Sequence, residues 1–418
     1  MQRIVIVGGG AGGLELACRL GRLVGKKHLA QVMLIDQHRQ HVWKPLLHEV
    51  ATGAFNPELG GADYLNLARL NGFQFVQGQL TELDRDNQQL TLAPTRDSRG
   101  RFLSGNQHLH YDTLVLAVGS QSADFGTPGV SEHAFFLDSP EQANVFHDHF
   151  LSKVQAHTVS DQKALLKVAI VGAGATGVEL SAELNSAAKI FRHYGARHLS
   201  LDITLLEAGP RILPVLNEKI ASKAQRELSK IGVKVRTGAK VVEATKSAFV
   251  LDGDEQIEAD LLVWAAGIRG ADWLAELGLE VSKRKQFQVN PQLQTSDPHI
   301  YAMGDCCDAA PPRAQAANQQ ASFLAKLLSS KVRGAEFSDT FTYQDYGSLV
   351  SLAEHSAVGG LMGNLAKGTL FVEGHLARWM YISLYRKHQF ALFGIWRTLG
   401  LMIADKLNGW VRPRLKLH

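Results

Sequence analysis

Cysteine is scarce in this chain of 418 residues, which contains only Cys18, Cys306 and Cys307. Three cysteines without a CxxC pair argue against a disulfide-stapled scaffold and against a dithiol redox relay. Because Cys306 and Cys307 are adjacent, a disulfide between them would be strained, and we expect all three thiols to be inert packing groups. The histidines lack HxxxH or HExxH spacing, so we expect no metal site.

Long hydrophobic runs are also absent. No stretch reaches the roughly 18 uncharged apolar residues that a membrane-spanning helix needs. The chain passes from Met1 into a β-branched run at Ile4–Val7 without the apolar segment and cleavage site of a signal peptide. We therefore expect a chain that faces the cytoplasm and does not cross a membrane, with a length suited to roughly two to three domains.

Glycine, by contrast, is concentrated in two loops of the same GxGxxG spacing. Each loop follows a short β-branched run and precedes a segment of helical character, which is the setting of a dinucleotide-binding loop. Glycines there let the backbone turn tightly and approach a pyrophosphate, whose charge is met by free amides at the helix start. The glycines are Gly8, Gly10 and Gly13 in the first loop and Gly172, Gly174 and Gly177 in the second. We therefore expect two dinucleotides, with electrons passing between them.

An acidic residue ends the next predicted strand after each loop. Asp36 closes the run QVMLID, and Glu207 closes the run ITLLE. A carboxylate in this place accepts hydrogen bonds from ribose hydroxyls and repels a 2′-phosphate, so Glu207 favours NADH over NADPH. The nearby cation Arg211 would attract a 2′-phosphate and so weaken that preference.

The chain alternates between predicted strands and helices, so we expect an α/β fold with two Rossmann-like dinucleotide-binding domains. The phrases at 111–120 and 259–270 are parallel strand-and-turn units. A third, at 295–307, returns a strand to Gly304 and Asp305, whose carboxylate suits the ribityl hydroxyls of a flavin dinucleotide. The first domain is therefore expected to be interrupted by the second. The predicted ranges are 1–138 and 286–345 for an FAD-binding domain, 139–285 for an NADH-binding domain and 346–418 for a C-terminal region.

The end of the chain carries an excess of positive charge, although the net charge of the whole is only +4. From Arg378 onward there are eight basic residues and one acid, Asp405. Aromatic residues such as Trp379, Phe390 and Trp396 are interleaved with them. This mixture is typical of an amphipathic helix that lies in a membrane interface against anionic lipid, and its large apolar content argues against nucleic-acid binding. The alternative is a packed helix pair that ends in a solvated basic tip.

Together these motifs resemble the two-dinucleotide flavoproteins of the glutathione-reductase type, and within them the bacterial membrane-associated type II NADH:quinone oxidoreductases. The resemblance covers essentially the whole chain. Besides the two loops, its most specific pieces are HVWKPLLHEVATG at 41–53, YAMGD at 301–305, PPRAQAANQQA at 311–321, HSAVGGLMGNL at 355–365 and RPRLKLH at 412–418. It implies that the first loop, Asp36, Gly304 and Asp305 hold FAD, and that the second loop and Glu207 hold NADH.

The resemblance also implies two further sets of site residues. The family's AQxAxQ quinone motif falls on residues 314–319, so Gln315 and Gln319 are expected to bond quinone carbonyls. Asn318 stands where some members have histidine, which puts a proton-donor role there in doubt. Glu179, expected in the first turn of its helix, is implied to position the nicotinamide or deliver a proton near the flavin. Complementing the helix dipole is the alternative.

The implied activity is that of a non-proton-pumping NADH:quinone oxidoreductase of the respiratory chain. A hydride passes from NADH to FAD, and two electrons continue to a membrane quinone. We expect a peripheral protein on the cytoplasmic side of the bacterial inner membrane, which keeps FAD when truncated before Arg378. The sequence leaves open which quinone is used and whether the protein forms a homodimer. The alternatives are a reductase of ferredoxin or rubredoxin, a sulfide:quinone reductase, which needs well-separated catalytic cysteines, and a non-catalytic NAD sensor.

Overall fold

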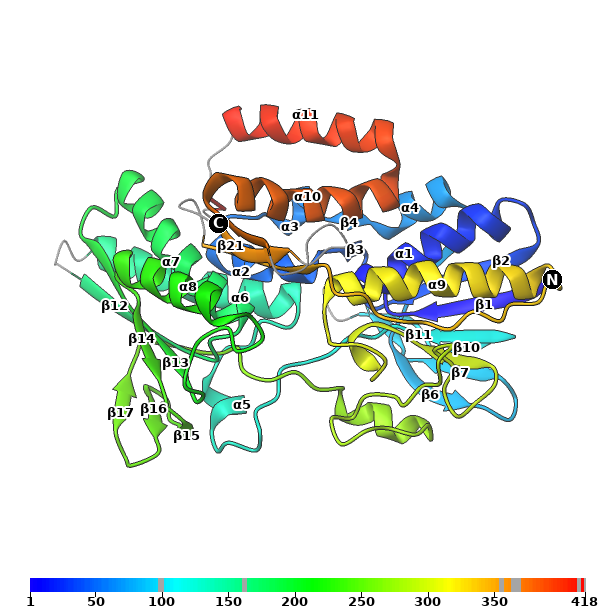
Figure 1. Ribbon diagram of the computed structural model, residues 1–418, viewed down its shortest axis with the longest axis horizontal. Helices are drawn as coiled ribbons and strands as arrows, with labels where there is room; N and C mark the ends of the chain where they lie inside the picture. Colours follow the sequence, from blue (N-terminus) through cyan, green and yellow to red (C-terminus); the bar gives the residue numbers. More distant parts are fainter. Residues whose placement is uncertain (97–100, 160–163, 353–356, 362–369, 412–414, 417–418) are drawn as a thin grey trace.

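Two parallel sheets form the frame of the molecule (Figure 1). The computed structural model describes residues 1–96, 101–159, 164–352, 357–361, 370–411 and 415–416. The first sheet has the strand order β19-β11-β1-β2-β5, and the second has the order β14-β13-β12-β18. Their strands are β1 (Gln2–Val7), β2 (Ala30–Asp36), β5 (Gln74–Gln77), β11 (Thr113–Leu116), β12 (Ala164–Val171), β13 (Leu199–Glu207), β14 (Lys234–Thr237), β18 (Leu261–Trp264) and β19 (Ile300–Ala302). Aliphatic runs form the central strands because parallel sheets are covered on both faces.

The first sheet is completed by a strand from far along the chain. β19 pairs in parallel with β11, with Tyr301 opposite Val115. The second sheet is formed entirely between these two strands in sequence order. The α/β fold with two dinucleotide-binding units is therefore confirmed, while the domain boundaries at 138, 285 and 345 remain a prediction.

Helices cover the sheets in equivalent places. α1 (Ala11–Leu20) and α7 (Ala175–His193) follow the first strand of each sheet, and α9 (Ala314–Val332) packs beside α1. Small antiparallel sheets of order β10-β7-β6 and β15-β16-β17 accompany the two units. The other elements before residue 345 are η1 (Gly21–Gly25), β3 (Gln40–His41), η2 (Lys44–Leu46), α2 (Leu47–Thr52), α3 (Pro57–Gly60), β4 (Ala62–Asp63), α4 (Tyr64–Asn71), β6 (Leu80–Asp84), β7 (Gln89–Leu92), β8 (Thr95–Arg96), β9 (Phe102–Ser104), β10 (Gln107–His110), α5 (Val130–His133), α6 (Pro140–Val159), α8 (Glu218–Lys230), β15 (Val241–Ala244), β16 (Ala248–Leu251), β17 (Gln256–Glu258), η3 (Asp272–Leu277) and η4 (Gly304–Cys306).

The C-terminal region forms a small sheet and a helical hairpin. β20 (Gly347–Ser351), β21 (Ala357–Leu361) and β22 (Leu370–Glu373) precede α10 (Gly374–Phe393) and α11 (Ile395–Val411). The helices reverse at Gly394, which has a φ of +78°, and an ion pair of 2.9 Å joins Arg386 on α10 to Asp405 on α11. In Figure 1, α10 lies against the body of the molecule and α11 lies outside it.

The hairpin shows how the predicted amphipathic tail is folded, while its association with a membrane stays a prediction. His388 and Gln389 of α10 are buried, whereas Trp396 of α11 is 85% exposed. The region is thus a packed helix pair in which α10 buries one side and keeps residues such as Trp379 exposed, while α11 is exposed along most of its described length.

The predictions about membrane-spanning helices and about two of the sequence motifs can be compared with the described residues only. Within them, no helix has both the length and the hydropathy required to cross a bilayer. Parts of the motifs at 355–365 and 412–418 lie outside the described residues.

Candidate functional site

The first glycine loop joins β1 to α1 with the backbone in a form that only glycine tolerates. Gly8 has a φ of +105°, and a Cβ on Gly13 would collide with the carbonyl oxygen of Gly8. Gly10 is the N-cap of α1, and a Cβ there would meet no atom within 4 Å. Helix and strand therefore approach closely, and the open side of the loop is at Gly10, where a phosphate group can reach the helix N-terminus.

The second loop, between β12 and α7, repeats this geometry. Gly172 has a φ of +99°, a Cβ on Gly177 would collide with the Gly172 carbonyl oxygen, and Gly174 caps α7 facing open space. The six predicted glycines thus occupy equivalent positions in two equivalent loops.

Asp36 ties the end of β2 to the first loop. Its carboxylate accepts hydrogen bonds from Gly9 N–H at 2.6 Å and from His38 N–H at 2.8 Å. Burial raises the pKa of Asp36, and these two bonds oppose the rise. The predicted contact with a ribose would be made by the face of the carboxylate that the loop leaves uncovered.

Glu207 occupies the same place at the end of β13. It accepts hydrogen bonds from Ala173 N–H at 2.9 Å and from Gly209 N–H at 2.8 Å. Arg211 donates to the carbonyl of Pro214 at 2.9 Å, so in this arrangement its guanidinium is engaged by the chain itself.

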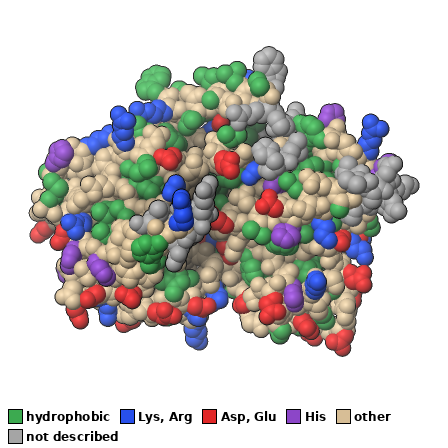
Figure 2. Space-filling view, turned by 180° about the vertical axis from the view of Figure 1, so that it is seen from behind, with side chains coloured by type: hydrophobic (Ala, Val, Ile, Leu, Met, Phe, Trp, Pro, Cys, Tyr) green, Lys and Arg blue, Asp and Glu red, His purple; other side chains and the backbone are tan. Residues whose placement is uncertain are grey.

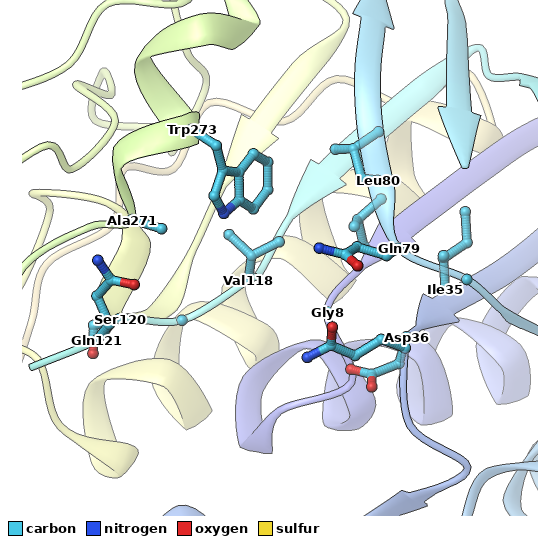
Figure 3. A pocket seen from close by; sticks show the side chains of 14 residues that line it. Gly8, Ile35, Asp36, Gln79, Leu80, Val118, Ser120, Gln121, Ala271 and Trp273 are labelled. Carbon is cyan, nitrogen blue, oxygen red and sulfur yellow. The ribbon is translucent and has the colours of Figure 1, made fainter. Parts of the chain in front are cut away.

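A pocket of about 260 Å³ opens beside the first loop (Figure 3). Asp36 and Gln79 line one side, and Val118, Ala271 and Trp273 line the other. Trp273 comes from η3, beyond the second sheet, and its indole ring faces the pocket in Figure 3. Trp273 was not among the predicted site residues, because nothing in its local sequence connects it with a loop so distant in the chain.

Gly304 and Asp305 lie after β19, as predicted. The Gly304 N–H donates to Gln320 at 2.6 Å, and the hydroxyl of Ser120 donates to the Asp305 carboxylate at 3.0 Å. Burial raises the pKa of Asp305, and the charge of Lys44 opposes that rise. Lys44 lies within the motif at 41–53 but was not among the predicted site residues.

Glu179 is buried where α7, α2, β20 and α10 meet. It is the fifth residue of α7, so it stands in the second turn instead of the predicted first turn. Its carboxyl accepts a hydrogen bond from Ser351 N–H at 3.0 Å and lies 3.6 Å from His48 Nδ1. Burial raises the pKa of Glu179 to about 8 and lowers that of His48 to about 4. At neutral pH this is a protonated carboxyl beside a neutral imidazole.

Gln315 and Gln319 lie on α9, and both are bonded to the segment before β20. The Gln315 amide donates to Asp345 at 3.1 Å and to the Gly347 carbonyl at 3.0 Å. The Gln319 amide donates to the Gln344 carbonyl at 2.8 Å and accepts from the Gln344 N–H at 3.0 Å. These amides therefore shape the wall beside α9, and a direct bond to a quinone would require an exchange of partners.

The three cysteine thiols are free and buried. Burial raises the pKa of the Cys18 thiol to about 12 and that of Cys306 to about 11, and it raises that of Cys307 further. A thiol protonated at neutral pH is a poor nucleophile. Within the ranges that the structure describes, no group of three or more His, Cys, Asp or Glu side chains is suited to hold a metal ion.

Comparison with known sequences agrees with this geometry. Residues 2–321 match the family model of the pyridine nucleotide-disulphide oxidoreductases. The chain is 39% identical to a type II NADH:quinone oxidoreductase of Haemophilus influenzae, with 100% of each chain covered. It is 28% identical to the protein of that name from Staphylococcus aureus, over 88% of this chain and 91% of the relative.

Solved structures share the fold over nearly the whole length. NDH2 from Plasmodium falciparum in complex with NADH has a TM-score of 0.80 at 20% identity, covering 99% of this chain and 100% of that one. The sulfide:quinone oxidoreductase of Aquifex aeolicus has a TM-score of 0.74 at 15% identity, with coverages of 98% and 95%. At such identities the likeness concerns the fold alone.

Proposed function

We infer the residue roles from one premise: the chain belongs to the pyridine nucleotide-disulphide oxidoreductase family, and within it to the type II NADH:quinone oxidoreductases. It is an FAD-dependent NADH dehydrogenase of the respiratory chain that reduces a quinone without pumping protons. The observation that carries this function in the structure is the repeated loop, in which three glycines and a bonded carboxylate recur.

The first loop fits FAD because it combines a free helix N-terminus, a carboxylate and a pocket of nucleoside size. We propose that Gly8, Gly10 and Gly13 admit the pyrophosphate, that Asp36 bonds the adenosine ribose and that Asp305 bonds the ribityl chain. When bound, FAD supplies the acceptor for the NADH hydride and the donor of two electrons to the quinone. The protein binds and orients the reactants and excludes water around them.

The second loop is proposed to bind NADH. Gly172, Gly174 and Gly177 admit its pyrophosphate, and Glu207 bonds its adenosine ribose. A 2′-phosphate would meet the Glu207 carboxylate, so NADPH is disfavoured.

Glu179 is proposed to hold a proton for the quinone or to position the nicotinamide. Since Oε1 accepts from Ser351 N–H, the proton of the neutral carboxyl belongs on Oε2, which faces His48. A pKa of about 8 is close to working pH, where a group gives and takes protons most readily. Gln315 and Gln319 are proposed to line the acceptor side of the flavin.

The outer layer of the hairpin is proposed to rest on the membrane. Aliphatic side chains recur every fourth residue along α11 and stand 41–80% exposed: Ile395, Leu399, Ile403, Leu407 and Val411. Trp396 and the cations Arg397 and Lys406 lie among them, exposed. Figure 2 shows hydrophobic side chains gathered at the edge of the molecule that this helix forms. Burial of such a row together with cationic contacts suits the anionic cytoplasmic leaflet of the bacterial inner membrane.

The enzymatic function is tested with the purified FAD-loaded protein. We expect NADH to bleach the flavin absorbance anaerobically and one equivalent of a short-chain quinone to restore it. Rapid bleaching by NADH without reoxidation by quinone would favour the ferredoxin or rubredoxin reductase. Bleaching too slow to support turnover would favour an NAD sensor, and reduction by sulfide in place of NADH would favour a sulfide:quinone reductase.

Membrane attachment is tested with anionic lipid vesicles. The double substitution of Leu399 and Ile403 by serine should weaken sedimentation with vesicles by at least roughly 10-fold, since each aliphatic side chain contributes about 1.5 kcal/mol or more when buried. Val215 is 75% exposed near the second loop, and Val215→Ser is the matched control. Equal sedimentation of the unaltered protein, the double variant and Val215→Ser would mean that the protein attaches to the membrane through a surface other than α11. Sedimentation velocity in detergent decides separately whether two copies associate.

A further inference from the structure

One carbonyl group of the first loop is held by side chains. The oxygen of Gly9 accepts a hydrogen bond from the Tyr64 hydroxyl at 2.8 Å and lies 3.0 Å from His41 Nδ1. Because a carbonyl oxygen can only accept, His41 carries its proton on Nδ1 and leaves Nε2 as an acceptor. Tyr64 and His41 are both buried, so water does not compete for these bonds.

The Gly9 carbonyl matters because it shares a peptide group with the Gly10 N–H. In the described part of the chain every peptide bond is trans, so this oxygen and this hydrogen point in opposite directions. Turning the oxygen toward Tyr64 and His41 therefore turns the Gly10 N–H toward the open side of the loop. That is where the pyrophosphate of a dinucleotide meets the start of α1.

His388 on α10 completes the arrangement from the C-terminal region. Its Nε2 lies 3.1 Å from Nε2 of His41, and since His41 accepts there, His388 must donate. The other nitrogen of His388 is 4.0 Å from the Glu15 carboxylate, which is beyond hydrogen-bond distance. Burial lowers the pKa of His41 to about 4 and that of His388 to about 3. Both rings are therefore neutral at pH 7, each with one defined donor.

α10 is fixed over the first unit by further contacts. Arg22 and Asn71 donate hydrogen bonds of 2.9 and 3.1 Å to carbonyl oxygens in the last turn of α10, where the helix itself offers no donor. The Trp43 ring stacks against His388. Figure 1 shows α10 lying across α1 and α4, which it contacts. His388 is thus a rigid donor to His41.

In the second loop the equivalent carbonyl group is held by the backbone. Ala173, the residue equivalent to Gly9, offers its carbonyl oxygen to the backbone N–H of Leu213 at 2.8 Å. A side chain is tolerated there, whereas a Cβ on Gly9 would collide with the Tyr64 hydroxyl. The same peptide is therefore oriented by neighbouring backbone in one loop and by a chain of side chains from α10 in the other.

We propose that His388 is a positioning residue for FAD, which acts through His41 to hold the Gly9–Gly10 peptide with its N–H toward the pyrophosphate. The proposal rests on the proposed placement of FAD in the first loop. It makes the membrane-facing hairpin part of the flavin site. It also argues against the expectation that a chain truncated before Arg378 keeps FAD.

The test measures the dissociation constant of FAD from flavin-stripped protein by flavin fluorescence. His388→Leu leaves His41 Nε2 buried without its donor and should weaken FAD binding by roughly 10-fold. His388→Gln restores an N–H near the same place and should recover most of the affinity. Lys387→Ala, on the exposed side of α10, is the matched control and should bind FAD as the unaltered protein does.

Two further variants separate positioning from packing. His41→Leu combined with His388→Leu should bind FAD no more weakly than His41→Leu alone, because the two residues act in series. Tyr64→Phe keeps its ring but removes the other donor to Gly9, and should weaken FAD binding by roughly 5-fold even if His388→Leu does not fold. Unchanged FAD affinity in His388→Leu, or equal losses in His388→Leu and His388→Gln, would overturn the proposal. If Gly13→Ala also binds FAD normally, the placement of FAD itself is wrong.

Discussion

The two glycine loops share one backbone but are embedded in different surroundings. In each, the first glycine is left-handed, the third lets the helix approach the strand, and a carboxylate accepts from the middle N–H. The carbonyl of the middle residue differs: Tyr64 and His41 hold it in the first loop, and the Leu213 backbone holds it in the second. Under the proposed placement, the resident FAD would lie on the loop fixed by more of the molecule, and NADH, which must leave, on the loop fixed locally.

A second difference lies two residues beyond each loop, where both helices bury a glutamate. Glu15 is 1% exposed and is bonded to Arg19 and Asn318. Glu179 is 6% exposed, and the acidic Glu183 lies one turn further on, where the first helix has Arg19. The first glutamate is thus compensated by a cation, while the second keeps a proton at neutral pH. The same position serves structure in one unit and is available for chemistry in the other.

The largest effect is expected when alanine replaces the third glycine of either loop. The new Cβ collides with a backbone oxygen that cannot move aside, at a cost of roughly 3 kcal/mol or more. Gly13→Ala should be purified without FAD. Gly177→Ala should keep its yellow colour but bind NADH more than about 100-fold more weakly. Visible absorbance and anaerobic NADH titration check both, and the opposite pattern would exchange the two cofactors between the loops.

The buried glutamate of the second unit predicts a pH dependence of stability. Folded Glu179 has a pKa of about 8 against an ordinary value of 4.5. Between these values the folded protein keeps a proton that the unfolded chain has lost, so the contribution of Glu179 to stability falls as pH rises from 5 to 8. The buried neutral histidines His41, His48 and His388 contribute the opposite trend below about pH 6.5, so the effect of Glu179 is read as the difference between two proteins. By linkage the contribution of Glu179 falls by about 3 to 4 kcal/mol between pH 5 and pH 8. Glu179→Gln should lack it, as seen in denaturant midpoints across this range, and parallel pH profiles of the two proteins would contradict the buried neutral carboxyl.

The roles of the two loop carboxylates, Glu207 and Asp36, are distinguished by replacing each with its amide. In Glu207→Gln, the charge that repels a 2′-phosphate is removed while an acceptor for ribose remains, so the preference for NADH over NADPH should narrow by roughly 10-fold. Asp36→Asn should leave that preference unchanged and lower FAD retention. The ratio of kcat/KM values for NADH and NADPH measures the first effect. An unchanged ratio in Glu207→Gln would remove this residue from the ribose site.

A smaller effect on activity is expected from substitutions at α9, where the quinone is proposed to bind. Gln315→Ala loses three hydrogen bonds that hold residues 345–347 against α9, so quinone reduction should slow by about 5-fold. Reduction of the flavin by NADH should stay nearly intact, as measured in the anaerobic half-reaction. Equal losses in both half-reactions would give Gln315 a role in flavin binding or folding instead.

The sequence was informative where the chemistry is local. The glycines, Asp36, Glu207 and the Gly304–Asp305 pair lie within short segments whose spacing dictates the turn, and each stands where it was expected. Family resemblance added Gln315, Gln319 and Glu179, whose roles stay predictions.

Contacts between distant segments could not be derived in this way. His41 meets His388, Trp273 faces the pocket beside β1, and Ser120 bonds Asp305, and each of these contacts joins segments that lie far apart in the chain. The packing of the tail could not be derived for the same reason. Its charge pattern describes its outer face, but the buried side of α10 is decided by the rings and donors that it meets on the first unit.

The difference between the two loops is tested most directly by measuring both dinucleotides on one variant, His41→Leu. This substitution removes a donor to Gly9 and leaves the backbone bond to Ala173 untouched. The dissociation constant of FAD should rise by roughly 10-fold, while that of NADH for the FAD-saturated protein should stay within about 2-fold of the unaltered value. An unchanged constant for FAD, or a parallel rise for both dinucleotides, would contradict the account.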